Sequence, residues 1–210
     1  VLKKSMVYIC YAGAKLDTDS LFAPLVSAFG DGVRPVYKTV VNNKVDTATY
    51  ETEPMPVAQS KLNLGFRLGE LAKSDPFAMR LFNVIYGGSA TSKLFNNVRE
   101  RLSLCYYCAS TIDFLKNAMF VYSGIETCNY QKAHDEILFQ LEEVKNGNIT
   151  KEEFDNAKAS LIDSYVQMGD SLASLIANRV AFDLNDINLT CVEQIEKVKE
   201  VTLERVVKAA

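Results

Sequence analysis

Strict alternation of apolar and polar residues in the segment QSKLNLGFRL, residues 59–68, constrains the fold more than any other pattern in the sequence. Four large apolar side chains in it lie two residues apart: Leu62, Leu64, Phe66 and Leu68. Successive side chains of a β-strand point to opposite faces of a sheet, so this spacing predicts a strand with one buried face. The chain therefore needs a sheet with a second layer against it.

The segments that follow are expected to form helices and a hairpin. Residues 74–86 begin with a Ser-Asp-Pro cap and end at Gly87 and Gly88, which is typical of a helix that runs into a glycine hinge. A second helix is expected at 91–101. Two strands, 104–112 and 119–126, are expected to pair as an antiparallel hairpin.

The last third of the chain is expected to be helical. Thr150 with Glu153, and Thr190 with Glu193, match the capping-box pattern that begins a helix. The expected helices are 131–146, from 150 to 168, from about 171 to 184, and from 190 to before 201.

The first third is less regular. It contains an expected buried strand at 6–12, a helix whose apolar face includes Leu21 and Phe29, and a polar linker at 31–56 with short strands expected at 36–41 and 47–53. Strands interleaved with helix pairs predict the α+β class: two layers, with a largely antiparallel sheet covered by helices on one face.

Composition excludes several classes of partner. Lys and Arg number 23 against 26 for Asp and Glu, and no basic block occurs, so a nucleic-acid partner is not expected. No apolar run approaches the roughly 18 residues of a spanning helix, so no membrane partner is expected either.

The 5 cysteines are odd in number and scattered, which indicates reduced thiols and predicts a cytoplasmic protein.

The sequence lacks the residues of a hydrolytic metal site. Such sites usually draw two or three histidines and a carboxylate, whereas this chain has only His134. Cys105 and Cys108 have the CxxC spacing, but residues three apart on a regular strand point to opposite faces, so their sulfur atoms are not expected to converge. No metal site is therefore predicted. A single histidine also argues against Ser-His or Cys-His catalysis.

One pair of residues suggests a binding role. Arg99 lies near the end of an expected helix and Tyr106 lies on the strand that follows, so the guanidinium and the phenol are expected to reach one place. Both groups donate hydrogen bonds to a peptide carbonyl, and the guanidinium would stabilise negative charge on that oxygen. A surface arginine and a core tyrosine is the structural alternative.

The segment GGSATSKLFNNVRERLSLCYYCAS, residues 87–110, resembles the segment G-G-x-x-S-x-L-F-x-x-[LV]-R-E-x-x-[GS]-L-x-Y of the second half of pitrilysin or insulinase-like zinc peptidases, which include mitochondrial processing peptidase. PVAQSKL, residues 56–62, and ITKEEF, residues 149–154, resemble the opening strand and the helical tail of that half. The resemblance covers residues 47–210. Ser103 and Cys105 depart from it, where glycine and alanine are common.

The resemblance implies the fold shared by LuxS and processing-peptidase-like metallohydrolases. It implies two domains: 1–45 as the closing strand and helix of a preceding homologous half plus a linker, and 46–210 as the second, peptidase-like half. The first half of such proteins carries H-x-x-E-H, which this sequence lacks. Zinc is therefore expected on a partner half and not in this chain.

The resemblance also implies site residues and partners. Arg99 and Tyr106 match the arginine and tyrosine that face the zinc across the cavity, and Gly87 and Gly88 are expected beside them as substrate-binding residues. The expected partners are a peptide substrate and a homologous zinc-bearing half or subunit, or a second copy of the chain. The alternative is a catalytically dead scaffold of the same fold, and composition does not distinguish the two hypotheses.

Overall fold

The computed structural model describes residues 7, 9–30, 40–41, 45–184 and 187–210. By compactness the chain forms two units: unit 1 comprises Val1–Val40 with Gln167–Asn188, and unit 2 comprises Val41–Val166 with Leu189–Ala210. The expected division between residues 45 and 46 follows homology and stays a prediction.

Unit 2 is built on a three-stranded antiparallel sheet with strand order β1-β3-β2. The strands are β1 (Ser60–Arg67), β2 (Cys105–Asp113) and β3 (Ala118–Ile125). β1 keeps the expected alternation, because Leu62, Leu64 and Phe66 are its less exposed residues and pair with Ser123, Val121 and Met119 of β3. The strand at 59–68 and the hairpin are both confirmed.

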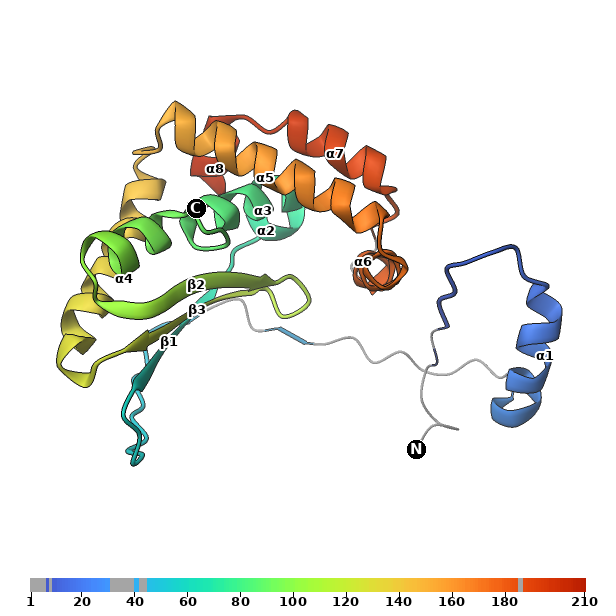
Figure 1. Cartoon of the computed structure of the whole chain (residues 1–210), viewed down its shortest axis with the longest axis horizontal. Coiled ribbons are helices and arrows are strands. Elements are labelled where there is room, and N and C mark those ends of the chain that lie inside the picture. Colours follow the sequence, from blue (N-terminus) through green and yellow to red (C-terminus); the bar gives the residue numbers. More distant parts are fainter. Residues whose placement is uncertain (1–6, 8, 31–39, 42–44, 185–186) are drawn as a thin grey trace. The chain divides into compact units, whose positions relative to one another are not determined.

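Helices cover one face of this sheet (Figure 1). Its nearest neighbours are α3 (Pro76–Tyr86) and a π-helix, η2 (Leu94–Arg101). The remaining elements of unit 2 are α2 (Leu71–Ser74), a short 3₁₀ turn η3 (Thr127–Asn129), α4 (Tyr130–Lys145), α5 (Lys151–Gly169, which ends in unit 1), α7 (Cys191–Lys199) and α8 (Leu203–Ala209). The predicted α+β architecture is therefore correct.

The core lies between the sheet and α3. Leu81, Phe82 and Tyr86 of α3 are almost completely buried, as is Val121 of the central strand. The Tyr86 hydroxyl donates a hydrogen bond of 2.9 Å to the carbonyl of Ile137 in α4, which satisfies its one buried polar atom and joins the two helices.

The capping signals in the sequence mark real helix starts. Asp75 Oδ1 accepts a hydrogen bond of 3.1 Å from Ala78 N at the start of α3. At α5, Thr150 Oγ1 accepts from Glu153 N at 3.1 Å, while Glu153 Oε2 accepts from Thr150 N at 2.7 Å. The same reciprocal arrangement begins α7 at Thr190.

Three expected strands of the first third are not strands where the structure describes them. Residues 47–53 are irregular, as are 40–41 and, in the first segment, 7 and 9–12. The other residues of the expected strands 6–12 and 36–41 lie outside the described part. An extended segment becomes a strand only when a neighbour accepts its backbone hydrogen bonds, and the pairs in the described sheet are β1 with β3 and β2 with β3.

Unit 1 contains α1 (Thr18–Phe29) and α6 (Leu172–Leu184). Asp17 caps α1 through a hydrogen bond of 3.2 Å from Asp19 N, but α1 has no buried residue. Among the described residues of the chain, no helix has the length and hydropathy needed to cross a membrane.

Candidate functional site

The glycine pair follows α3 and lies directly against β2. Gly87 N donates to Asn83 O at 2.9 Å, and Gly87 O accepts from Ser110 N of β2 at 3.0 Å. A Cβ atom at Gly87 would meet Ser110 Oγ at 2.6 Å and Ser110 N at 2.8 Å. Close packing of two backbones therefore explains why glycine stands here.

The expected helix at 91–101 is a π-helix from Leu94 to Arg101, and its wider turn is visible in its last hydrogen bond. Leu102 N donates to Asn97 O, five residues earlier, at 3.1 Å. π-helical turns are rare and often occur at functional sites. This one carries Arg99 beside β2.

A partly buried ion pair holds the residue before the π-helix. Lys93 Nζ lies 2.9 Å from Glu153 Oε1, and the Lys93 side chain is only 9% exposed. Burial raises the pKa of the Glu153 carboxyl, but the hydrogen bonds from Thr150 and Lys93 outweigh burial and leave that pKa below its usual value. The carboxylate that caps α5 therefore also holds Lys93.

The Arg99 guanidinium is half-exposed and only weakly engaged. Its Nε lies 3.5 Å from Glu100 Oε1, and its Cζ lies 4.7 Å from the centre of the Phe95 ring. No hydrogen bond occupies its two terminal nitrogens within the described residues. They are available to an added acceptor.

A β-bulge at Tyr106 overturns the prediction that the two cysteines point to opposite faces. Cys105 pairs with Ile125 and Tyr107 pairs with Gly124, so Tyr106 is an extra residue on β2. The extra residue reverses the alternation. Cys105 and Cys108 therefore both lie on the helix-covered face, and their side chains interact.

This interaction moves the pKa values of the two thiols in opposite directions. A hydrogen bond from Cys108 is the main cause that lowers the pKa of Cys105 to about 7; burial opposes it, and Ser123 and the charge of Arg99 assist it. The same hydrogen bond and burial raise the pKa of Cys108 well above the ordinary thiol value. Cys105 is thus the thiol that ionises first.

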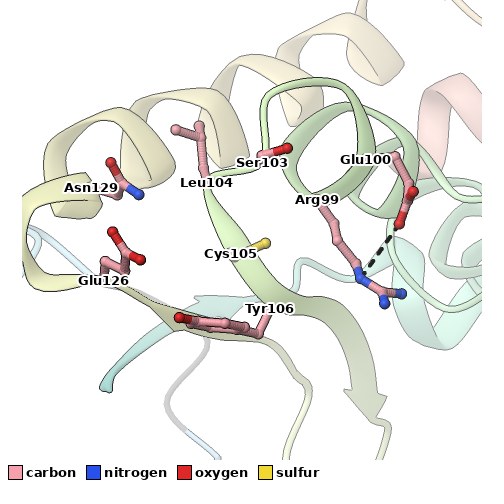
Figure 2. Close-up of a pocket in the computed structure, with 8 residues that line it drawn as sticks. All are labelled: Arg99, Glu100, Ser103, Leu104, Cys105, Tyr106, Glu126 and Asn129. Atoms are coloured by element: carbon pink, nitrogen blue, oxygen red, sulfur yellow. Dashed lines mark ion pairs between the residues drawn. The ribbon is translucent and has the colours of Figure 1, made fainter. Parts of the chain in front are cut away.

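A pocket of about 420 Å³ lies at this place, and both predicted catalytic residues line it. Figure 2 shows Cys105 between them, with the Arg99 guanidinium on one side and the Tyr106 ring extending toward Glu126 on the other. The two polar ends face apart and do not meet at one point. The full lining is Arg99, Glu100, Ser103, Leu104, Cys105, Tyr106, Glu126 and Asn129.

A second pocket, of about 370 Å³, is lined by Gly87, Gly88 and Arg99 together with Phe95 and residues of β2. Arg99 lines both pockets. The structure therefore brings all four predicted site residues to two hollows that share the Arg99 side chain, with the glycine pair in one and Tyr106 in the other.

The residues that the structure describes do not fit a zinc site. His134, the single histidine, contacts Asp135 Oδ1 at 3.1 Å and stacks on Tyr130. The described residues contain no group of three or more His, Cys, Asp or Glu side chains placed to hold a metal ion.

Sequence reasoning missed Cys105, Glu126 and Asn129 as lining residues. The CxxC spacing is a signal for Cys105, but on a strand without a bulge the two sulfurs would point to opposite faces, so the sequence predicts no shared site. Glu126 and Asn129 follow the end of β3, where nothing in the local sequence distinguishes a pocket residue from a turn residue.

Comparisons with known proteins bear on the family. Residues 6–161 match the family described as "Peptidase M16 inactive domain". The probable inactive metalloprotease YmfF of Bacillus subtilis is 32% identical over 181 residues, which is 81% of this chain and 41% of YmfF. The chain thus spans less than half the length of this relative.

Solved structures agree on the fold. A conserved protein of Enterococcus faecalis has a TM-score of 0.76 and 30% identity, over 91% of this chain and 46% of that one. A peptidase M16 inactive domain of Pseudomonas fluorescens has a TM-score of 0.74 and 21% identity, over 92% and 47% of the two chains. The chain belongs to the peptidase M16 (insulinase) family, as an inactive domain of that family.

Proposed function

We propose that this chain is the substrate-binding, non-catalytic half of an M16 peptidase. It holds an unfolded peptide at the pocket between Arg99 and Tyr106, and it polarises the peptide carbonyl in trans to a zinc ion carried by a homologous half or subunit. The observation that carries the proposal is that Arg99 and Tyr106, chosen from sequence alone, line one pocket.

The chemistry of the two side chains suits a peptide backbone. Arg99 and Tyr106 stand on either side of Cys105, so a peptide crossing this strand would meet a guanidinium and then a phenol (Figure 2). Both are hydrogen-bond donors, and peptide carbonyls are acceptors. The positive charge of a guanidinium favours negative charge on a bound carbonyl oxygen.

Arg99→Ala tests the proposal. In this chain it removes a charged hydrogen-bond donor, and such bonds contribute about 1.5 to 3 kcal/mol, so the Kd for a fluorescently labelled unfolded peptide should rise about tenfold to a hundredfold. Fluorescence anisotropy at a fixed salt concentration measures the change. In a complete enzyme that includes the zinc-bearing half, the same change should lower turnover while the zinc content stays the same.

Arg101→Ala is the matched control. Arg101 lies on the same helix and carries the same charge, but it pairs with Glu136 at 3.4 Å and lines neither pocket. Its removal should leave peptide affinity within about twofold. Equal effects of the two substitutions would mean that Arg99 acts only through its positive charge and not through its place in the pocket. An unchanged affinity after Arg99→Ala would overturn the proposal.

A scaffold function is the second candidate, and the name of YmfF as a probable inactive metalloprotease favours it. A scaffold has no need of a peptide at this pocket. If the wild-type chain binds no unfolded peptide at all, the scaffold is the better account.

A further inference from the structure

The cysteine pair has chemistry that the peptide role does not use. The bulge at Tyr106 places Cys105 and Cys108 on one face of β2. They differ in access: Cys105 is half-buried and lies on the wall of the larger pocket, whereas Cys108 is only 4% exposed. One thiol is reachable from solvent, and its neighbour lies buried on the same face of the strand.

The surroundings of Cys105 favour its thiolate. The titratable and charged groups nearby are Arg99 and Glu100 from the π-helix, Tyr106 and Cys108 from β2, and Glu126 after β3. Cys108 is the main group that stabilises the ionised sulfur, by hydrogen bonding, and the positive charge of Arg99 adds to this. The resulting pKa of about 7 lies below the ordinary thiol value, so a larger share of Cys105 is ionised at neutral pH than of an unperturbed thiol.

We propose that Cys105 is a modification site for small disulfides, which enter the pocket beside Arg99 and leave a mixed disulfide on its sulfur. The Cys105 thiolate attacks one sulfur of a disulfide RS–SR; a new S–S bond forms to Cys105 and the original S–S bond breaks. The electron pair leaves with RS⁻, which takes a proton from solvent. Cys105 is oxidised and one half of the small disulfide is reduced.

The other thiols provide internal standards. Cys128 is exposed, and Cys10 and Cys191 are partly buried. If exposure alone governed reactivity, Cys128 would react first. A thiol with the pKa of Cys105, about 7, has a larger thiolate fraction at pH 7 than a free cysteine of pKa about 8.5, and after allowance for its weaker nucleophilicity it should react about threefold faster than that free cysteine.

The test uses the full chain and 4,4′-dithiodipyridine, a small aromatic disulfide. One equivalent is added at pH values from 6 to 9, the released thiopyridone gives the rate, and mass spectrometry of peptides locates the label. Cys105 should carry most of the label at pH 7, its rate should be half-maximal near pH 7, and Cys108 should remain unlabelled. Labelling of Cys128 ahead of Cys105, or a half-maximal rate near pH 8.5, would overturn the proposal.

Two substitutions separate the hydrogen bond from exposure. Cys108→Ala removes the group that most lowers the pKa of Cys105, so the pH of half-maximal rate at Cys105 should move upward, whereas Cys128→Ser should leave the rate at Cys105 unchanged. Circular dichroism confirms that each variant is folded. A Cys108→Ala protein that is folded and keeps the wild-type pH profile would contradict the proposed arrangement. Because the readout is thiol chemistry, it does not depend on peptide binding.

Discussion

Gly87 illustrates how packing and function can select the same residue. Its resemblance to family members suggests substrate binding, while its contacts show a backbone pressed against Ser110 of β2. Sequence alone identified the glycine pair and its place after a helix. It could not identify the partner backbone, because Ser110 comes more than twenty residues later.

Gly87→Ala should destabilise unit 2. The new methyl group would meet the backbone nitrogen of Ser110 at 2.8 Å, and a backbone atom in a sheet cannot move aside without loss of its hydrogen bonds. Overpacking of this kind costs about 1 to 3 kcal/mol, which a lower midpoint of urea unfolding would reveal.

Gly69→Ala serves as the comparison, since a Cβ atom there meets nothing within 4 Å. Its midpoint should stay close to that of the wild type. If both alanine variants unfold alike, the close approach of Gly87 to β2 is not what the protein requires.

At the scale of elements, Asp75 joins two helices that are far apart in the sequence. Its carboxylate caps α3 and also forms a two-pronged contact with Arg205 of α8, at 2.8 Å from Oδ2 to Nε and 2.8 Å from Oδ1 to Nη2. The hydrogen bond from Arg205 is the main cause that lowers the pKa of Asp75.

Asp75→Asn should weaken the folded state. Asparagine caps a helix as well as aspartate does, so the substitution removes only the partly exposed ion pair with Arg205, which contributes up to about 1 kcal/mol after allowance for solvent screening. The pKa of Asp75 is lower in the folded state than the value of about 3.9 in the unfolded state. The charge of Asp75 therefore stabilises the folded state fully above that unfolded pKa, and this stabilisation is lost as the pH falls through the folded pKa. Urea unfolding at pH 7 and below pH 4 measures both effects.

Glu142→Gln is the control for this experiment. Glu142 pairs with Lys145 at 2.6 Å on the exposed surface of α4, and such pairs contribute little. The stability difference between wild type and Asp75→Asn should shrink in acid. A difference that stays constant down to the lowest pH would mean that the charge of Asp75 contributes nothing.

Strong local signals made most elements predictable. The alternation in β1, the Asp75 cap and the capping boxes of α5 and α7 each depend on residues within one short segment. The bulge and the π-helix escaped prediction because partner strands and packing determine them. α8 was also missed, since Thr202 and seven helical residues give too short a pattern.

For the whole molecule, stability should reside in unit 2. α1 buries no residue, whereas the residues between the sheet and α3 are almost inaccessible. Removal of residues 1–40 should therefore leave the thermal unfolding midpoint of the remainder within a few degrees of the full chain. Differential scanning calorimetry of the two chains tests this.

Solubility gives an independent check of the same truncation. Phe22 and Val26 of α1, with Val7, Ile9 and Tyr11 before it, expose large apolar side chains. The shorter chain should aggregate less at equal concentration. A truncated chain that loses its cooperative transition would show instead that the first forty residues complete the core.

The extra residue at position 106 determines which face of the sheet the neighbouring side chains of β2 point to. Residues before it and after it obey opposite parities, so exchanging Tyr106 for another amino acid would leave every neighbour on its present side, and deleting it would remove the bulge but keep Cys105 two residues before Cys108, on the same face. The bulge therefore compensates for the odd spacing of the two cysteines, because a regular strand that kept all four residues 105–108 would carry the two sulfurs on opposite faces of the sheet.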